Sequence, residues 1–472
     1  MSDPTYALPT MPSAAPDEPR APDPVSVALG NASLLGVGYL MLRRRRLALA
    51  AVVGSAVLVL RLVTTASPSY EVAVLVWWAA VVGHGWFLAR GGGGRGTARR
   101  QRLVALGITL PVLLVVGLLR FDAFRIGRSV TEARESGDCA RVSTAQDSVW
   151  FGHRVADAPL TARGDEAVAA CDRLRTARAE LSTALTGDTE AMADGFGTLA
   201  SVLAKGGNEK TVEATLNGFL GRLPAKDPCD TAAVTDWLRD RGRSHDVLDR
   251  AADTAALTAP AALVGCGDDL LADDSWQQAL AYYQRLLDRY PGSGLADRAR
   301  KGARKATLSI ELANVRSLLS GGTGTQPEYC SRPAKYSGAK PMGKGTNRAL
   351  FYASDLYGTD YSDQLPGSWK AGDATDTVLV VCMGEAASGP SVETCPYRSK
   401  SSGAISYKSF TKIEIPVKVY ELRTGKPVAD RKIQINGTSC PSTIYAPEGT
   451  GSMYLDASTS DVRSAFRPLV VR

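Results

Sequence analysis

The chain has 472 residues and a formal net charge of +7, and this charge is unevenly distributed. Residues 1–120 hold 12 arginines, no lysine and 5 acidic residues, whereas residues 121–472 hold 43 basic and 43 acidic residues. Residues 121–472 therefore have no excess of basic residues, which argues against a nucleic-acid-binding domain in this region. The chain has only three histidines, so a multi-histidine metal site is not expected either.

The N-terminal segment 1–24 is rich in proline, alanine and aspartate. Such a segment cannot bury enough apolar surface to offset its chain entropy, so we expect a disordered tail. It lacks a basic region ahead of an apolar one, so a cleaved signal peptide is not expected.

Four apolar stretches predict a transmembrane anchor over residues 25–120. Each is about 17–18 residues long, the lower limit for a helix that crosses a bilayer core of about 30 Å. The alternative, four buried soluble helices, is disfavoured because no amphipathic segment nearby would cover them. The stretches are roughly Val25–Leu42, Leu47–Thr64, Val72–Leu88 and Leu103–Leu119.

Arginines predict the orientation of this anchor. Arg43–Arg46 lie in the first loop, and Arg90, Arg95, Arg99, Arg100 and Arg102 flank or occupy the third. The positive-inside rule makes both loops cytoplasmic. We therefore expect a multi-pass protein of the cell membrane whose N-terminus and large C-terminal region both lie outside. Arg120, Arg125 and Arg128 follow the fourth stretch and are evidence against this orientation, but they are fewer than the arginines of the two loops.

All eight cysteines lie beyond residue 138, in the part expected outside. Structural disulfides persist in oxidising compartments, so we expect disulfides, with free buried thiols as the alternative. There is no C-x-x-C, and the spacings suit no usual zinc module. Cys382 and Cys395 are closest in sequence and bracket the loop Gly384–Thr394, so we expect them to be bonded. The other pairs expected are Cys330–Cys440, Cys139–Cys171 and Cys229–Cys266.

Residues 121–319 read as an extracytoplasmic helical domain. Apolar residues at steps of three and four mark two helices, and Gly187-Asp188 and Gly206-Gly207 interrupt the pattern. The first helical face holds Val168, Cys171, Leu174, Ala177, Leu181 and Leu185, and the second holds Met192, Phe196, Leu199 and Leu203.

A repeat within this region resembles the tetratricopeptide pattern. Residues 219–224 align with 286–291 at about twice the 34-residue tetratricopeptide period, and Ala255–Pro260 supplies a third helix ending in proline. A generic array of helical hairpins is the alternative, and either array normally binds peptides or proteins. The match is best in residues 274–311. There Trp276, Leu280, Tyr283 and Leu287 should face the core, Gln278 and Gln284 should face solvent, Tyr290-Pro291 should end the helix, and Ala296 and Ala299 should line the next one.

Residues 320–327 read as a flexible linker. Residues 328–472 then predict a small β-rich domain containing disulfides, most simply a sandwich. Strands are expected over 377–383, 407–411, 453–455 and 466–471, with a hairpin over 413–435 that turns at Arg423–Pro427.

Five segments of this last region carry a resemblance to known proteins, namely Leu379–Cys382, Cys395–Tyr397, Val417–Lys426, Cys440-Pro441 and Phe466–Val470. Together they resemble the C-terminal β-domain of actinobacterial cell-envelope proteins of unknown function. The whole chain is then similar to an actinobacterial polytopic membrane protein of unknown function with a tetratricopeptide-like ectodomain. The resemblance implies a location but no chemistry.

Several motifs match catalytic or binding patterns without the context these need. Gly91-x-Gly93-x-x-Gly96 follows an apolar helix and not a strand, and S-x-x-K at Ser337 and Ser409 has no Ser-Asp-Asn partner. Asp268-Asp269 and Asp273-Asp274 are expected to cap helix starts. Asp355, Asp360 and Asp363 with Tyr352, Tyr357 and Tyr361 are expected to form a solvated loop, with a glycan or calcium site as the alternative. We therefore expect no catalytic, cofactor-binding or metal-binding residues.

These features favour a non-enzymatic, membrane-anchored scaffold or protein-interaction protein of the cell envelope. Its expected partners are the lipid bilayer and an envelope or membrane protein bound through the helical region, with no nucleic acid. One alternative is an envelope sensor or an accessory subunit of a membrane transporter or signalling complex. A second is a protein that binds or hydrolyses cell-wall glycan.

Overall fold

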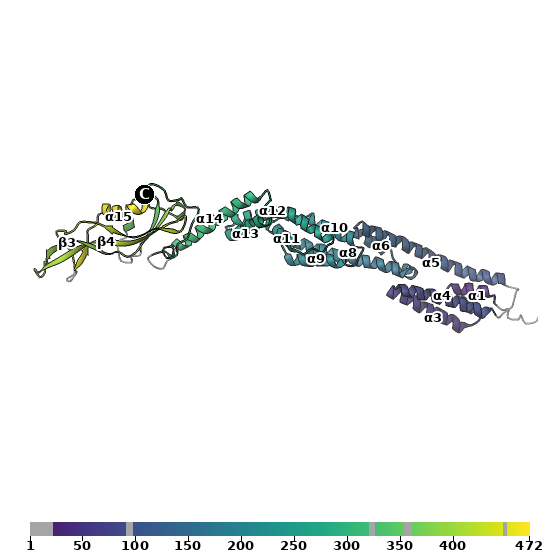
Figure 1. Cartoon of the computed structure of the whole chain (residues 1–472). Coiled ribbons are helices and arrows are strands. Elements are labelled where there is room, and N and C mark those ends of the chain that lie inside the picture. Colours follow the sequence, from purple (N-terminus) through teal and green to yellow (C-terminus); the bar gives the residue numbers. More distant parts are fainter. Residues whose placement is uncertain (1–21, 91–97, 321–325, 354–360, 447–450) are drawn as a thin grey trace, which may run out of the picture. The chain divides into compact units, whose positions relative to one another are not determined.

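The computed structural model describes residues 22–90, 98–320, 326–353, 361–446 and 451–472 (Figure 1). Most of the expected tail (1–24) and of the expected linker (320–327) therefore lies outside the described residues. The chain divides into two compact units, Met1–Thr258 and Ala259–Arg472.

The first unit begins with a bundle of apolar helices. Three of the predicted spans are confirmed as membrane-capable helices, Arg45–Thr65, Ser69–Ala89 and Arg99–Glu135, and a fourth such helix is Val247–Ala272. The first three have only 11–17% of their apolar windows buried, as lipid-facing helices require. The bundle consists of α1 (Pro24–Ala32), α2 (Val37–Met41), α3 (Arg45–Thr65), α4 (Pro68–Ala89) and α5 (Ala98–Glu135).

The predicted span Val25–Leu42 is wrong as a continuous helix. The backbone takes left-handed conformations at Leu34 and Gly36 between α1 and α2, and the two short helices fold back on each other. Two glycines allow this close approach, because a Cβ on Gly30 would lie 2.9 Å from the backbone nitrogen of Gly38. We call residues 24–41 the N-terminal hairpin.

The rest of the first unit is helical, as predicted. The expected apolar faces are buried, with Leu174 and Leu181 in one helix and Phe196 and Leu199 in the next among the core residues. Helices α8 and α9 run side by side (Figure 1). The elements are α6 (Cys139–Asp147), α7 (Phe151–Ala156), α8 (Ala158–Ala184), α9 (Thr189–Leu203), α10 (Glu209–Leu220), α11 (Pro228–Asp240), the 3-10 turn η1 (Val247–Asp249) and the start of α12 (Arg250–Ala272).

The second unit begins within α12 and continues with α13 (Trp276–Arg289) and α14 (Ala296–Ser320). Ala279, Tyr283 and Leu286 form the buried face of α13, whereas Leu287 is only partly buried. The prediction that Leu287 faces the core is thus wrong by one residue, and Leu286 takes this place. Ala279, Tyr283 and Leu286 follow one another at steps of four and three residues, as on one face of a helix. Gln278 and Gln284 are exposed, and the helix ends before Pro291, both as predicted.

Helices α13 and α14 pack closely around Tyr283. A Cβ on Gly302 of α14 would lie 2.3 Å from the tyrosine ring, and one on Gly267 of α12 would lie 2.7 Å away. The expected helix end at Ala255–Pro260 is wrong, because Pro260 lies inside α12, which continues to Ala272. The helical hairpin α13–α14 is therefore present, but a tetratricopeptide repeat is not confirmed.

Within the described residues, the C-terminal strands form one six-stranded sheet organised around the long strand β4. Strands β2, β3 and β5 pair with β4 antiparallel, β6 pairs with it parallel, and β1 pairs parallel with β2. The predicted hairpin is confirmed as β4–β5, but a two-sheet sandwich is not. The strands are β1 (Ala349–Ala353), β2 (Leu379–Met383), β3 (Ala387–Arg398), β4 (Ile405–Glu421), β5 (Lys426–Ile435) and β6 (Ser452–Tyr454).

The predicted strand over 466–471 is wrong, because residues 466–470 belong to helix α15 (Thr459–Val470) and Val471 forms only an isolated bridge with Thr346. Val462, Phe466 and Leu469 recur at steps of four and three, and all are buried in the core shared with the sheet. Ser458 accepts a hydrogen bond from the backbone N–H of Asp461, whose carboxylate accepts one from the backbone N–H of Ser458. This capping box marks a helix start.

Candidate functional site

Buried polar side chains in the membrane-capable bundle form the first candidate site. Asn31 of the N-terminal hairpin is fully buried. Its side-chain nitrogen donates to the carbonyl oxygen of Val81 in α4 at 3.2 Å, and its side-chain oxygen accepts from the backbone N–H of Tyr39 at 3.2 Å. One asparagine therefore closes the hairpin and fastens it to α4.

Tyr39 connects the hairpin to an imidazole. Its hydroxyl oxygen lies 2.8 Å from Nδ1 of His84 and 3.3 Å from the carbonyl oxygen of Val81. Tyr39 is buried, whereas His84 is exposed on the surface of the bundle. An ionisable side chain in a membrane segment is costly and usually marks a functional or assembly site.

The Tyr39–His84 pair borders a small hollow of about 260 Å³. The hollow lies between α3 and α4, and its other lining residues, such as Ala51, Trp77 and Val81, are apolar. The Tyr39 phenol and the His84 imidazole can share or pass a proton. Among the described contacts, neither group has a further base beside it that would activate it as a nucleophile. The geometry therefore suits hydrogen bonding within the membrane better than covalent catalysis.

Ion pairs mark the two ends of the bundle. Asp23, the N-cap of α1, forms a two-point contact with Arg102 near the start of α5, at 2.8 and 3.0 Å. Toward the other end, Arg120 lies 3.6 Å from Glu71 at the start of α4. Arg102 and Arg120 are separated by about 27 Å along a helix that rises about 1.5 Å per residue. This separation is close to the thickness of a bilayer core.

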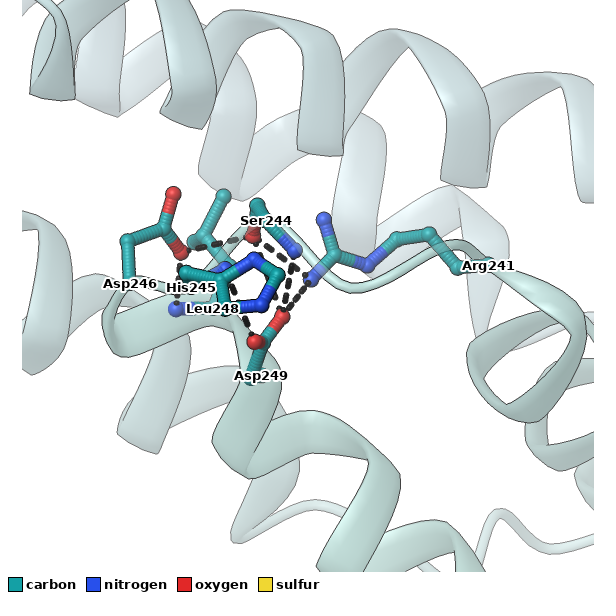
Figure 2. A network of polar contacts seen from close by, with 6 residues as sticks. All are labelled: Arg241, Ser244, His245, Asp246, Leu248 and Asp249. Carbon is teal, nitrogen blue, oxygen red and sulfur yellow. Dashed lines mark hydrogen bonds and ion pairs between the residues drawn. The ribbon is translucent and has the colours of Figure 1, made fainter.

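A second candidate is the polar loop that joins α11 to η1 (Figure 2). The Asp249 carboxylate accepts hydrogen bonds from the backbone N–H groups of Ser244 and His245, both at 2.9 Å, and from the Arg241 guanidinium at 3.1 Å. The Ser244 N–H is the largest factor that lowers the pKa of Asp249, and it outweighs the opposing effect of burial. The carboxylate is thus held ionised at the centre of the loop.

This loop contains the residue types of a serine-hydrolase triad but not its geometry. A triad needs the serine hydroxyl on a ring nitrogen of the histidine. Instead, the Ser244 hydroxyl lies 2.8 Å from a carboxylate oxygen of Asp246 and 3.1 Å from one of Asp249. His245 joins this network through its backbone N–H, as Figure 2 shows. The network therefore fixes the loop and offers no nucleophile.

The structure changes two of the expected disulfides. The pairs Cys382–Cys395 and Cys330–Cys440 are wrong, because β2 and β3 pair with different parts of β4. Cys382 lies opposite Lys418 and Cys395 lies opposite Lys408, about 33 Å apart at about 3.3 Å per strand residue. The observed pairs are Cys330–Cys382, Cys395–Cys440 and, as predicted, Cys139–Cys171, and Cys229 and Cys266 are each disulfide-bonded as well.

The aspartate pairs do not cap helix starts as expected. Asp268 and Asp269 lie inside α12, and Asp273-Asp274 lie in the turn before α13. Asp268 instead accepts hydrogen bonds from the Tyr283 hydroxyl at 2.6 Å and from Arg298 at 2.5 Å. Burial first, and this carboxylate second, raise the pKa of Tyr283. The cluster therefore ties α12 to α13 and α14.

The S-x-x-K motifs are engaged in structural contacts. The Ser337 hydroxyl lies 3.1 Å from a carboxylate oxygen of Glu311. Ser409 lies on β4, 2.8 Å from the Thr394 hydroxyl. On a strand, residues three apart face opposite sides, so Ser409 and Lys412 cannot act together.

The other matched motifs leave no site within the described residues. Gly91-x-Gly93-x-x-Gly96 falls outside them, as do Asp355, Tyr357 and Asp360 of the polar-aromatic loop. Of that loop, Tyr352 lies on β1 and Asp363 is 3.8 Å from Lys370. Glu393 lies near Cys395 and Cys440 at a spacing that would suit a metal, but both sulfurs are used by the disulfide.

The Tyr39–His84 contact was not predicted from the sequence. A signal was present, because Asn31, Tyr39 and His84 are polar residues within otherwise apolar stretches. The fold of the N-terminal hairpin was needed to bring them together. Comparison with family models, characterised proteins and solved structures finds no match to this chain. The functional argument therefore depends on the features described above.

Proposed function

We propose that the chain is a non-enzymatic, membrane-anchored interaction protein that holds an ectodomain on the outer side of the membrane. The observation that carries this proposal is α5. Its 38 residues begin in a membrane-capable segment and continue into contacts with α6, α7, α8 and α10. Such a helix is about 57 Å long, nearly twice the bilayer core. The anchor and the helical region are thus one continuous piece of structure.

The N-terminal hairpin enters the membrane and returns to the same side in this proposal. Its first residues pair with Arg102, and its end leads directly into Arg43–Arg46 at the start of α3. Both arginine groups belong on the cytoplasmic side by the positive-inside rule. The N-terminal tail is therefore cytoplasmic, in place of the outside location expected from four crossings, and α3, α4 and α5 cross three times.

The fourth membrane-capable helix, Val247–Ala272, belongs to the ectodomain in this proposal. Its apolar window is 39% buried, against 11–17% for the other three. A crossing there would also place Cys139–Cys171 and Cys330–Cys382 on opposite sides of the membrane. Disulfides persist in oxidising compartments, so a single outer location accounts for both pairs.

The helical region is the proposed protein-binding part of the ectodomain. Stacked helical hairpins leave extended surfaces that bind peptides or proteins, and the α13–α14 pair is such a hairpin. A tetratricopeptide-like array in an actinobacterial cell envelope remains our proposal for this region. Its partner is an envelope protein.

The exposed imidazole favours a second function, as an accessory subunit of a membrane complex. His84 is exposed on the bundle surface although it lies within α4. A polar group facing lipid is costly, and a hydrogen bond to a partner helix would remove that cost. A pull-down of the full chain in mild detergent tests this function, and His84→Phe is expected to lose a membrane partner while envelope partners are retained.

Reporter fusions to the full chain test the proposed topology. Fusions at residue 22 and at residue 94 are expected to be active inside the cell, and fusions after residues 135 and 272 outside. A reporter at residue 22 that is active outside would restore four N-terminal crossings. Activity inside for the fusion after residue 272 would make Val247–Ala272 a span and remove the proposed ectodomain.

A further inference from the structure

Four exposed aromatic side chains lie just beyond the apolar part of α5. Phe121 and Phe124 belong to α5, and Trp150 and Phe151 lie at the start of α7. Their exposed fractions are 61%, 57%, 58% and 64%, in the same order. Aromatic side chains bury a large area when they are covered, so a group of exposed rings indicates a contact surface. We call Trp150 and Phe151 the aromatic pair.

Polar contacts fix the height of α7 along α5. The Nε2 atom of His153 in α7 lies 3.1 Å from a carboxylate oxygen of Asp122 in α5. At the other end of α7, the Asp157 carboxylate lies 3.6 Å from Arg120 of α5. Asp122 follows the last residue of the apolar stretch, Leu119, by about 5 Å at about 1.5 Å per residue. Both ends of α7 are therefore held close to the end of the apolar stretch.

This height coincides with the headgroup layer of a bilayer. A bilayer measures about 30 Å across its hydrocarbon core and about 40–45 Å in all, so each headgroup layer is about 5–8 Å thick. Helix α7 also contacts α3, whose membrane-capable segment ends at Thr65, and Arg120 contacts Glu71 at the start of α4. The ends of three membrane-capable helices thus meet at the level of α7. An exposed side chain at this level is surrounded by lipid headgroups.

Packing within α7 holds the aromatic pair in its exposed position. The Trp150 ring lies edge-on to the His153 ring, with 5.7 Å between ring centres, and a Cβ on Gly152 would lie 2.6 Å from the Trp150 ring. Gly152, His153 and Ala156 form the buried side of α7, which leaves Phe151 on the exposed side. The exposure of both rings therefore follows from the way α7 packs against its neighbours.

The exposed face of α5 leads from the membrane to the level of the aromatic pair. Leu114, Leu118 and Phe121 follow one another at steps of four and three residues, so they share one helix face, and each is about 60% exposed. The lipid-facing surface of the span therefore continues to this level. The other side of α7 is polar, because Arg154 forms a two-point contact with Asp165 of α8 at 2.7 and 3.1 Å. Apolar rings on one side and charges on the other are typical of a segment in the membrane interface.

We infer that the start of α7 is a membrane-interface anchor, in which Trp150 and Phe151 insert into the phospholipid leaflet where α5 leaves the bilayer. The rings gain an apolar environment there, and the indole N–H of Trp150 can still reach headgroups or water. Inserting the aromatic pair restrains α7 against the bilayer surface. Because α7 leads directly into α8 and the Cys139–Cys171 disulfide ties α6 to α8, the anchor restrains the tilt of these three helices relative to the membrane.

The anchor goes beyond the proposed function, because it requires only that α5 crosses the membrane. It is the same whether the end of α5 that carries α7 lies outside or inside the cell. The reporter fusions that test the topology therefore do not decide it, and it needs an experiment that detects contact with lipid.

Photo-crosslinking of the full chain in phospholipid vesicles tests this inference. The photoreactive residue p-benzoylphenylalanine replaces one of three exposed residues in turn: Phe151 of the anchor, Leu114 within the span, or Ala179 of α8. Ala179 is the matched control, because it lies about 32 Å along α8 from the end beside α7, at about 1.5 Å per residue. The variants at Phe151 and Leu114 are expected to attach at least about fivefold more lipid than the variant at Ala179.

The three positions separate failure of the anchor from failure of the proposed function. If lipid attaches at Leu114 but no more at Phe151 than at Ala179, the anchor is overturned and the span of α5 stands. A crosslink from Phe151 to a second copy of the chain in place of lipid also overturns the anchor. If no lipid attaches at Leu114, α5 does not cross the membrane, and the anchor is overturned together with the proposed function.

Fluorescence quenching provides a second measurement that uses Trp150 itself. The emission lost in Trp150→Phe should be quenched by phospholipids brominated on the acyl chain near the headgroup, about threefold more than the emission lost in Trp237→Phe. Trp237 is the control because it lies in α11 and packs against Phe196, with 5.1 Å between ring centres. Equal quenching of the two emissions would overturn the inference for Trp150.

Discussion

Gly302→Ala should destabilise the second unit although alanine is the better helix former. Gly302 lies inside α14, where replacing glycine by alanine ordinarily gains about 1 kcal/mol. Here the new Cβ would lie 2.3, 2.6 and 2.7 Å from three atoms of the Tyr283 ring. Tyr283 cannot retreat, because it is fully buried, hydrogen-bonded to Asp268 and also in close contact with Gly267 of α12.

The expected magnitude follows from these two opposing effects. Overpacking a filled core costs about 1–3 kcal/mol, and the immobile ring places this site at the upper end. After the gain in helix propensity, Gly302→Ala should destabilise α13 and α14 by about 2 kcal/mol. Amide hydrogen exchange in these helices should then be about thirtyfold faster.

Gly197 in α9 provides the matched control. It is also a glycine inside a helix, but a Cβ there would meet no atom within 4 Å. Gly197→Ala should therefore slow exchange in α9 by about fivefold. Mass spectrometry of the full chain in detergent reports both helices in the same experiment. If Gly302→Ala slows exchange in α14 as Gly197→Ala does in α9, the packing described for Tyr283 is wrong.

Three further predictions concern other parts of the chain. Phe466→Ala removes a fully buried ring from α15 and should cost about 3–5 kcal/mol, measured by exchange in the sheet, and a cost below about 1 kcal/mol would contradict its burial. The Arg316 guanidinium lowers the pKa of Asp373 below its usual 3.8, so this pair stabilises above about pH 4 and its contribution is lost as the pH falls further. Both side chains are about half exposed, so Arg316→Gln should lower the free energy of unfolding by only about 0.5–1 kcal/mol at pH 7. The variant should also lose less stability than the wild type as the pH falls below about 4, and an unchanged dependence of the free energy of unfolding on pH would contradict this. Replacing Cys139 and Cys171 by serine opens a loop with a sequence separation of 32 and should cost about 3.7 kcal/mol by the chain-entropy model, and an unchanged thermal midpoint would contradict it.

The sequence predicted elements whose periodicity is local and uninterrupted. Leu174 and Leu181 of α8 and Phe196 and Leu199 of α9 recur at helical steps, and all are buried as expected. In α13 the pattern was correct but the phase was wrong by one residue, because Leu286 and Leu287 are adjacent and equally apolar. Periodicity cannot choose between two such neighbours when the opposing helix is unknown.

Predictions failed where backbone conformation or strand register decided the outcome. Average hydropathy made 25–42 a span, but Leu34 and Gly36 reverse the chain there. In the β-rich domain, Cys382 and Cys395 are close in sequence but lie opposite different parts of β4. The Cys395–Cys440 disulfide was missed for the same reason, because Cys440 reaches β3 only in the folded sheet.

The uninterrupted helix α5 also has a mechanical consequence. Each residue of an α-helix advances the chain by about 1.5 Å and turns it by about 100°. Inserting a single alanine just after Leu119 would rotate everything that α5 carries beyond the membrane by about 100° relative to α3 and α4, with almost no change in height. In the proposed topology, a small rotation of α5 within the membrane would likewise turn α6, α7 and α8 beyond it, so α5 would couple the two sides of the membrane mechanically.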